Sequence, residues 1–442
     1  MTRTLASLTC TLFLGGTLLL LAGCSSHDDG DGTPVPDDSS KTRPLSEAPP
    51  IEPPPGPDDV VGIVRDYRTG PVGGATLSSG NTVTTTDAWG RFVLRNAPSE
   101  YDLICVLSGR AAVIHGLTTR KPTVQCPDNG GWVNNAPIHI DYSDAISIGS
   151  ERITFAVRDD VGTEEIFYGR TGPNTLDANT TWAGPIPELT GRFLSLEYEA
   201  PRLGAPTNYL GIAFSPMRIL PGQQATFHPI YSPITTTTTV TGIARPAPGT
   251  TLYETYLLLG FGGVYSPVNR SYALRTTPAQ FVVPEVPGAS WAIKYSAYET
   301  GSPGSSGGAY SGGIVPIAAD GSVPDIDLAT PPKIVLPADG ATDFDVGSEI
   351  AWQGDGTCTV TVSSAPDYRV ELTTRESHIT MPDLSAVGIS FRHGAKHDLF
   401  LWCHRRPYRA PDADPVLDVV NYYAGEYLGT SGYGRLTAVT SR

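Results

Sequence analysis

Short stretches in which apolar and polar residues alternate recur along the chain after residue 59. They include ITFAVR, FLSLEYEA, WAIKYSAY, CTVTVSS and DLFLWCHR, and glycine, proline and other turn residues separate them. Alternation with period two is typical of strands in sheets, and no stretch combines a helical period with helix caps. The pattern predicts an all-β chain of tandem β-sandwich modules.

The first residues do not follow this pattern. Arg3 precedes LFLGGTLLLL, an apolar run of signal-peptide length, and the run ends in LAGC at Cys24. LAGC resembles the lipobox of bacterial lipoproteins, which implies removal of residues 1–23 and a lipid on the Cys24 thiol. Ser25 favours the outer membrane, because Asp after the cysteine is the retention signal of the inner membrane. An ordinary signal peptide with a chance cysteine is the alternative, and it would also export the chain.

Residues 24–59 read as a tether. Proline, aspartate and serine dominate, so this stretch cannot bury enough apolar surface to fold and is predicted to be disordered. From residue 25 on it carries nine acidic residues against Lys41 and Arg43, a net charge of −7 out of −15 for the chain. The rest of the chain is therefore only mildly acidic, which argues against a nucleic-acid partner.

Cysteine usage fits export. Of six cysteines, one lies in the leader and Cys24 is the lipidation site. The other four form two couples in an oxidising compartment, and no C-x-x-C redox motif is present. The expected disulfides join Cys105 to Cys126 and Cys358 to Cys403.

Val60 to Leu107 carries the motifs V-x-G-x-V-x-D, TGPVGGATL and TTDAWGRFVL. They resemble the carboxypeptidase regulatory-like domain, which implies a seven-stranded, transthyretin-like sandwich that is non-catalytic. No zinc-carboxypeptidase domain accompanies it here. The sequence predicts a hairpin turn in which Gly90 has positive φ, with Phe92 and Leu94 pointing inward.

The chain divides into four predicted modules. FVLRNAPSE at Phe92 aligns with FVVPEVPGA at Phe281, so residues 60–146 and 239–330 are interpreted as two copies of one sandwich. NNAPIHIDYS and VPDIDLAT are taken as their closing strands, and residues 147–238 as a diverged third copy. Residues 331–442 resemble a fibronectin type III-like or Ig-like domain, in which an early tryptophan fills the core.

Catalytic and metal-binding patterns are weak. Ser306 lies in a G-x-S-x-G match within a glycine-serine loop, without the strand and helix that a nucleophile elbow needs. His393, His397 and His404 suit a metal only on a helix, and the β pattern there predicts partly exposed histidines instead. We therefore predict no catalytic residue, no metal and no cofactor.

Paired carboxylates are a further candidate. Glu197 and Glu199 flank one tyrosine in a predicted strand and so share a face. That face is predicted to be the solvated one, which leaves the pair without a catalytic setting.

Aromatic residues in predicted loops are the main binding candidates. Rings on loops can stack on sugars or partner proteins, although the same rings can also cover the ends of a sandwich. The candidates are Trp89, Trp132, Trp182, Tyr422 and Tyr423.

These features together predict a non-catalytic binding or structural protein, lipid-anchored in the outer membrane, whose partner is a glycan or an envelope protein. Two alternatives stay open. The chain could be an accessory or carrier of extracellular polymer-degrading activity, or it could be a component of an outer-membrane assembly.

Overall fold

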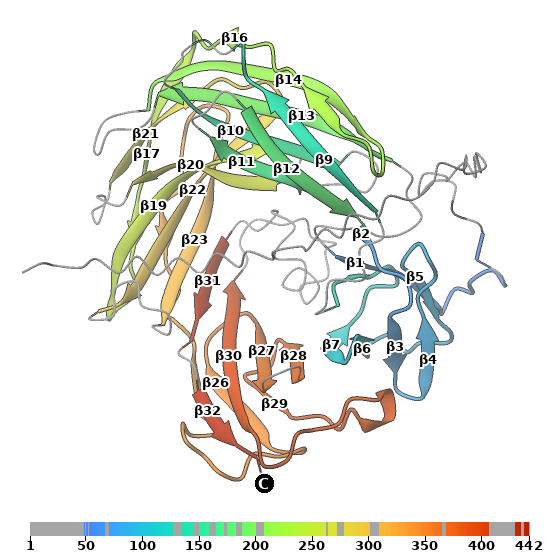
Figure 1. The fold of residues 1–442 in the computed structure, drawn as a ribbon. Helices are drawn as coiled ribbons and strands as arrows, with labels where there is room; N and C mark the ends of the chain where they lie inside the picture. The colour runs from blue at the N-terminus through green and yellow to red at the C-terminus, as the bar shows by residue number, and fades with distance from the viewer. Residues whose placement is uncertain are drawn as a thin grey trace, which may run out of the picture. The chain divides into compact units, whose positions relative to one another are not determined.

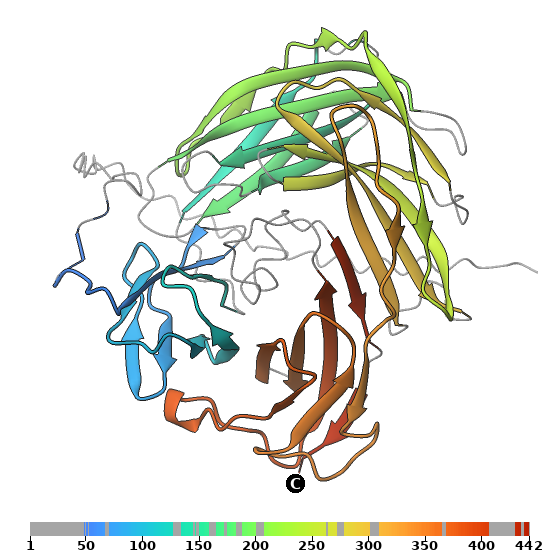
Figure 2. The same ribbon diagram turned by 180° about the vertical axis from the view of Figure 1, so that it is seen from behind.

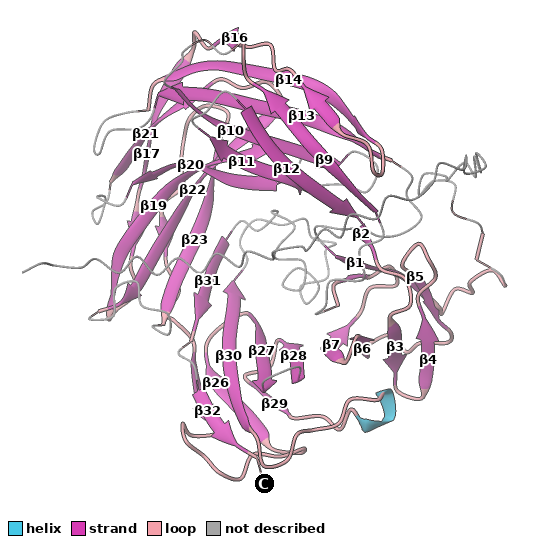
Figure 3. Ribbon diagram, viewed as in Figure 1, coloured by secondary structure: helices cyan, strands magenta, loops and turns pink. Residues whose placement is uncertain are grey.

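The computed structural model describes residues 48–441 apart from several gaps, and all structural statements below concern these residues. The gaps are 49, 52, 67–69, 127–133, 145, 147–149, 159–164, 172–174, 183–187, 200–206, 262–263, 272–277, 301–308, 365–367, 406–428 and 435–436. The described structure is almost entirely strand, as the sequence predicts, with one short 3-10 helix at Ser385–Val387 (Figure 3). No helix in it is long and apolar enough to cross a bilayer.

The first unit is a sandwich of two sheets. Its strands are β1 (Val60–Asp66), β2 (Gly70–Pro71), β3 (Thr76–Ser79), β4 (Thr82–Thr85), β5 (Arg91–Leu94), β6 (Tyr101–Leu107), β7 (Arg110–Leu117) and β8 (Thr123–Val124). β1 pairs antiparallel with β2 and β5 and parallel with β8, whereas the facing sheet has the order β4-β3-β6-β7. Apolar side chains from both sheets form one core, to which Cys105 and Cys126 contribute a disulfide.

The turn between β4 and β5 differs from the predicted hairpin. Gly90 has a φ of +73° and Phe92 and Leu94 are buried, as expected. The Asp87 carboxylate accepts the backbone N–H groups of Trp89 and Arg91, both at 2.9 Å, which fixes the turn. However, β4 pairs with β3 and β5 pairs with β1. The turn therefore carries the chain from one sheet of the sandwich to the other.

The second unit repeats this topology. Its strands are β9 (Asn134–Asp141), β10 (Ser150–Arg158), β11 (Glu165–Thr171), β12 (Thr175–Trp182), β13 (Leu189–Glu199), β14 (Tyr209–Ile219), β15 (Ala225–Phe227) and β16 (Ser232–Pro233). β9 pairs antiparallel with β12 and parallel with β15, and the facing sheet has the order β11-β10-β13-β14-β16. The expected closing strand NNAPIHIDYS is thus β9, which opens the second unit.

The third unit shows the topology once more. Its strands are β17 (Thr237–Gly242), β18 (Ala244–Arg245), β19 (Thr250–Phe261), β20 (Val264–Ser271), β21 (Ala279–Pro284), β22 (Ala289–Glu299), β23 (Tyr310–Ile317) and β24 (Ile326–Asp327). β17 pairs antiparallel with β21, β18 pairs parallel with β24, and the facing sheet has the order β20-β19-β22-β23. Strand pairing therefore shows in three units the repeat that the sequence shows only weakly.

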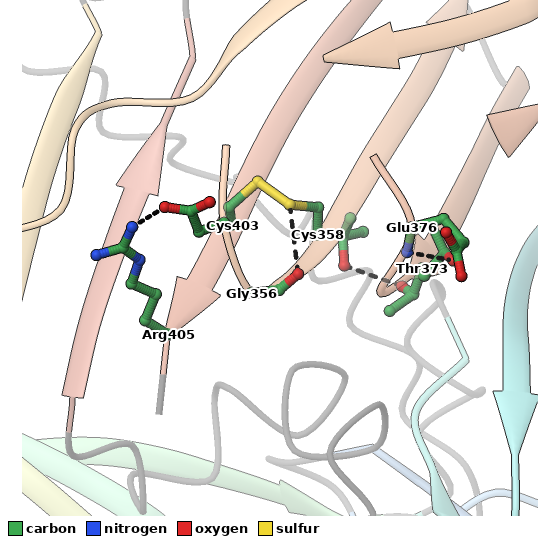
Figure 4. Close-up of a disulfide and its surroundings, with 9 residues drawn as sticks. Gly356, Cys358, Thr373, Glu376, Cys403 and Arg405 are labelled. Atoms are coloured by element: carbon green, nitrogen blue, oxygen red, sulfur yellow. Dashed lines mark hydrogen bonds and ion pairs between the residues drawn. A yellow bond between two sulfur atoms is a disulfide. The ribbon is translucent and has the colours of Figure 1, made fainter. Parts of the chain in front are cut away.

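The C-terminal unit has a different topology. Its strands are β25 (Lys333–Leu336), β26 (Glu349–Gln353), β27 (Thr357–Ser364), β28 (Tyr368–Thr374), β29 (His378–Thr380), β30 (Lys396–Arg405), β31 (Gly429–Tyr433) and β32 (Thr437–Thr440). The sheet β25-β26-β29 faces β28-β27-β30-β31, and Trp352 is buried in the core between them, as predicted. Cys358 and Cys403 lie opposite each other on β27 and β30 and form the second expected disulfide (Figure 4).

Strand pairing joins the third, C-terminal and first units into one sheet. β23 pairs antiparallel with β31, and β28 pairs parallel with β7, so twelve strands form one continuous order from β20 to β4 (Figures 1 and 2). β32, which pairs with β30, is the thirteenth strand of this sheet. Alternate residues of β7 belong to different cores. Ala112 and Ile114 face the first unit's own core, whereas Ala111 and Val113 belong to the core of the C-terminal unit.

Candidate functional site

Two of the predicted binding aromatics are buried. Trp89 is 8% exposed and packs in a cluster with Ile138 of β9, and Trp182 is fully buried at the end of β12 in the same cluster. The expectation of exposed loop rings is wrong for both, because the Asp87–Gly90 turn folds onto the second unit and Trp182 belongs to a strand. The other three candidates lie outside the described residues: Trp132, Tyr422 and Tyr423.

The histidines were also predicted to be more exposed than they are. His397 and His404 lie within β30 and are buried, whereas His393 stays exposed in the turn at Gly394. The His397 ring stacks on Phe391 at 4.8 Å, and burial lowers the pKa of His404 to about 4. Among the described residues no cluster of histidine, cysteine and carboxylate side chains could hold a metal.

A buried ion pair lies inside the second unit. Arg152 on β10 and Glu197 on β13 are register partners, both fully buried, with Nη2 and Oε1 3.5 Å apart. Ser150 donates a hydrogen bond to Glu197 and accepts one from Arg152, and the Ile146 N–H donates to the second carboxylate oxygen at 2.9 Å. The predicted solvated face of Glu197 is therefore wrong.

Both faces of β13 are covered, which explains the error. Phe193 on the ion-pair face packs in a cluster with β9 and β12, whereas Leu194 and Leu196 on the other face belong to a cluster shared with the third unit. Alternation along a strand identifies a solvated face only where one face meets water.

Hydroxyl groups extend this polar network. Thr154 bonds to Tyr142 at 2.7 Å and to Ser195 at 3.1 Å, and Ser195 bonds to Tyr231 at 2.7 Å. The Arg152 guanidinium lies over the Tyr142 ring, and burial raises the pKa of Tyr142 to about 12. Each of these residues has a hydrogen-bond partner within the protein, so the network forms a buried, hydrogen-bonded polar core.

A row of half-buried aromatic rings runs across five neighbouring strands of the thirteen-stranded sheet, from β19 to β30. We define the aromatic row as Tyr253 on β19, Tyr298 on β22, Tyr310 on β23 and Trp402 on β30. Successive ring centroids are 5.1, 5.7 and 5.6 Å apart. The His404 ring stacks against Trp402 at 6.1 Å and ends the row.

Strand register places these rings on one face. Tyr298 and Tyr310 are direct partners, and Tyr310 and Trp402 are both opposite residue 433 of β31. Tyr253 is the extra residue of a β-bulge between Leu252 and Glu254, and such a bulge re-aims a side chain. The opposite face of the same strands carries Tyr295, which is fully buried.

Polar side chains adjoin the aromatic row on the next strands of the C-terminal unit. Thr359, the register partner of Trp402, shares a hydrogen bond of 2.9 Å with Thr373. Two and four residues before Thr373 on β28, Glu371 and Arg369 form an ion pair at 2.6 Å. At the other end of the row, the Tyr256 hydroxyl donates to the carboxylate of Glu254. The row is therefore bordered by hydroxyl groups and paired charges.

The outer faces of the repeated units differ in what covers them. On the outer face of the first unit, Ala111 and Val113 are buried in the C-terminal core, and on that of the second unit Leu194 and Leu196 pack into the cluster shared with the third. The outer face of the third unit instead carries the half-buried rings. Sequence reasoning missed them because it searched loops, although alternation along WAIKYSAYE places Tyr298 on the face opposite Trp291 and Tyr295.

Comparison with known proteins identifies no family. No protein-family model and no curated protein matches the chain. The Bacillus anthracis TIE protein is 13% identical over 61% of this chain, with a TM-score of 0.17, and the chain spans half of its length. The chicken CNTN1 FN1-FN3 domains are 11% identical over 84% of this chain and all of theirs, with a TM-score of 0.15. The shaft pilin SpaA from Lactobacillus rhamnosus GG is 14% identical over 44% of this chain and 96% of its own, with a TM-score of 0.13. Scores this low carry no conclusion about function.

Proposed function

We propose that this protein is a lipid-anchored binding protein of the bacterial outer membrane that recognises a glycan or an envelope protein without catalysis. The aromatic row is the observation that carries this proposal. Half-buried tyrosine and tryptophan rings offer rigid contact area with polar tips, and this combination is favoured at binding surfaces.

The ends of the chain support the same proposal. The lipobox-like LAGC supplies an anchor at Cys24, and the acidic, proline-rich residues that follow supply a tether. The carboxypeptidase regulatory-like resemblance of residues 60–107 implies a non-catalytic sandwich, and the same strand topology recurs in the next two units. A chain of such sandwiches suits the presentation of a binding face away from a membrane.

Two measurements on the full chain test this function. Cys24→Ala should move the protein from the membrane fraction to the soluble exported fraction, because the lipid is the proposed anchor; Ser25→Ala is the matched control. Wild-type protein in detergent should retain a component of the source bacterium's labelled envelope fraction, and Trp402→Ala should lose it. The proposal fails if the Cys24 variant stays in the membrane or if retention does not depend on the aromatic row.

A further inference from the structure

We propose that the aromatic row is a binding site for a neutral polysaccharide, which lies along the row and crosses the strands of the sheet. This inference rests on the proposed function and deepens it by naming the ligand class. The site comprises Tyr253, Tyr298, Tyr310 and Trp402, with the polar side chains beside them.

The arrangement of the rings favours an extended ligand. The four rings come from β19, β22, β23 and β30, so the row runs across the strands, and all centroid separations lie between 5.1 and 5.7 Å. Neighbouring rings are inclined at 84°, 38° and 87°, so a ligand along the row meets ring edges as well as ring faces. A chain of linked sugar rings presents apolar C–H surfaces at regular intervals, and aromatic faces stack on such surfaces without needing one particular sequence of units. Stacking platforms for single-stranded nucleic acids use the same principle.

The charges on this face favour a neutral ligand. Arg369 is paired with Glu371, and Glu254 is bonded to the Tyr256 hydroxyl. Alternation along β22 also places Lys294 on this face, so the described side chains here include both signs of charge and no cationic cluster. A polyanion would require several cations along its path, because charge neutralisation dominates such binding.

A protein partner would need other side chains around the aromatic row than those present. A stable protein interface buries about 800 Å² of each partner around a well-packed central patch. The large hydrophobic side chains that are exposed in the described structure are Val83, Ile146, Phe214, Ile230, Val335, Leu336 and Val346, and none of them belongs to the row. A single file of rings bordered by hydroxyl groups, such as those of Thr359 and Thr373, instead matches the alternation of apolar and polar edges on a sugar chain.

The test uses full-length protein in detergent and polysaccharide from the source bacterium's envelope, deproteinised and separated on an anion exchanger into neutral and anionic fractions. Binding is measured by calorimetry for wild type, Tyr298→Ala, Trp402→Ala and Tyr265→Ala. Tyr265 is the matched control because it is also a half-buried tyrosine. It lies on β20 and accepts a hydrogen bond from Ser290, at the end of β22 that is away from Tyr298. Tyr298→Phe and Trp402→Phe keep a ring and separate stacking from folding.

We expect the neutral fraction to bind, both alanine variants at the row to weaken binding by about tenfold or more, and Tyr265→Ala and the phenylalanine variants to stay within a few-fold of wild type. The inference is overturned if the neutral fraction does not bind, if the anionic fraction binds more tightly, or if the row variants bind like wild type. Row-dependent retention of an envelope protein, with no binding of the neutral fraction, overturns the glycan inference and leaves the proposed function standing.

Discussion

Corresponding strands of the repeated sandwich bring apolar residues together in two copies and an ion pair in another. In the first unit, Leu77 on β3 lies opposite Cys105 on β6, and in the third unit Leu257 on β19 lies opposite Ile293 on β22. In the second unit the strands β10 and β13 bring Arg152 opposite Glu197, again with both side chains fully buried. A shared topology therefore does not fix the polarity of the core.

The comparison shows what a polar core requires. Glu197 receives hydrogen bonds from Ser150 and from the Ile146 backbone, so its charge is compensated by more than Arg152 alone. A buried ion pair of this kind adds little net stability over an apolar pair, but the loss of one partner leaves a charge without compensation. The second unit is thus predicted to be the most sensitive of the three to a single substitution in its core.

The largest expected effect comes from Glu197→Ala, which leaves the Arg152 guanidinium buried beside a cavity. We expect this substitution to lower the free energy of unfolding by about 3–5 kcal/mol, measured by urea denaturation. Glu199→Ala is the matched control, because Glu199 is an exposed residue two positions along the same strand, and it should change stability by less than about 0.5 kcal/mol.

The double variant Arg152→Met/Glu197→Leu sharpens the comparison, because it gives the second unit an apolar residue pair at this position, as in the first and third units. We expect its stability to lie close to that of wild type, since apolar residues of similar volume can replace a buried ion pair. Equal losses in the single and double variants would show instead that the site needs polar side chains for a reason other than charge compensation.

His404 predicts an intermediate effect that depends on pH. Burial lowers its pKa to about 4 from an ordinary value of 6.5, so the folded protein keeps this imidazole neutral. Below pH 6.5 the unfolded chain takes up a proton that the folded protein does not, and stability falls until pH reaches about 4. Linkage gives a loss of about 3 kcal/mol over this window, and burial lowers the pKa of His397 as well, which acts in the same direction.

Unfolding free energies measured between pH 7.5 and 4 test this expectation. His404→Gln should reduce the slope by about 1.4 kcal/mol per pH unit, which corresponds to one proton. His393→Gln is the matched control for loss of an imidazole, because His393 lies exposed in the preceding turn. An unchanged slope in the His404 variant would contradict a neutral, buried imidazole at this position.

The sequence predicted the local features better than the contacts between units. Alternation identified the strands, and the expected disulfide between Cys358 and Cys403 is present, because the two cysteines lie opposite each other on the apolar faces of neighbouring strands. The same rule failed for Glu197, since the third unit covers what would be a solvated face in an isolated sandwich. The burial of Trp89 likewise depends on a packing partner from another unit, which no local pattern reveals.

The smallest expected effect on stability belongs to the aromatic row, and it separates a binding surface from a core. Tyr298 keeps part of its ring in water, whereas Tyr295, three residues earlier on the opposite face of β22, is fully buried. Because Tyr298 is only half-buried, Tyr298→Ala should cost less than the truncation of a core ring, about 1 kcal/mol of the free energy of unfolding, measured by urea denaturation beside the control Tyr265→Ala. A loss of 3 kcal/mol or more would assign the ring to the packing of the sheet, and the aromatic row would then resemble the covered outer faces of the first two units. A small loss of stability combined with a large loss of binding would instead assign the half-buried ring of Tyr298 to a recognition surface.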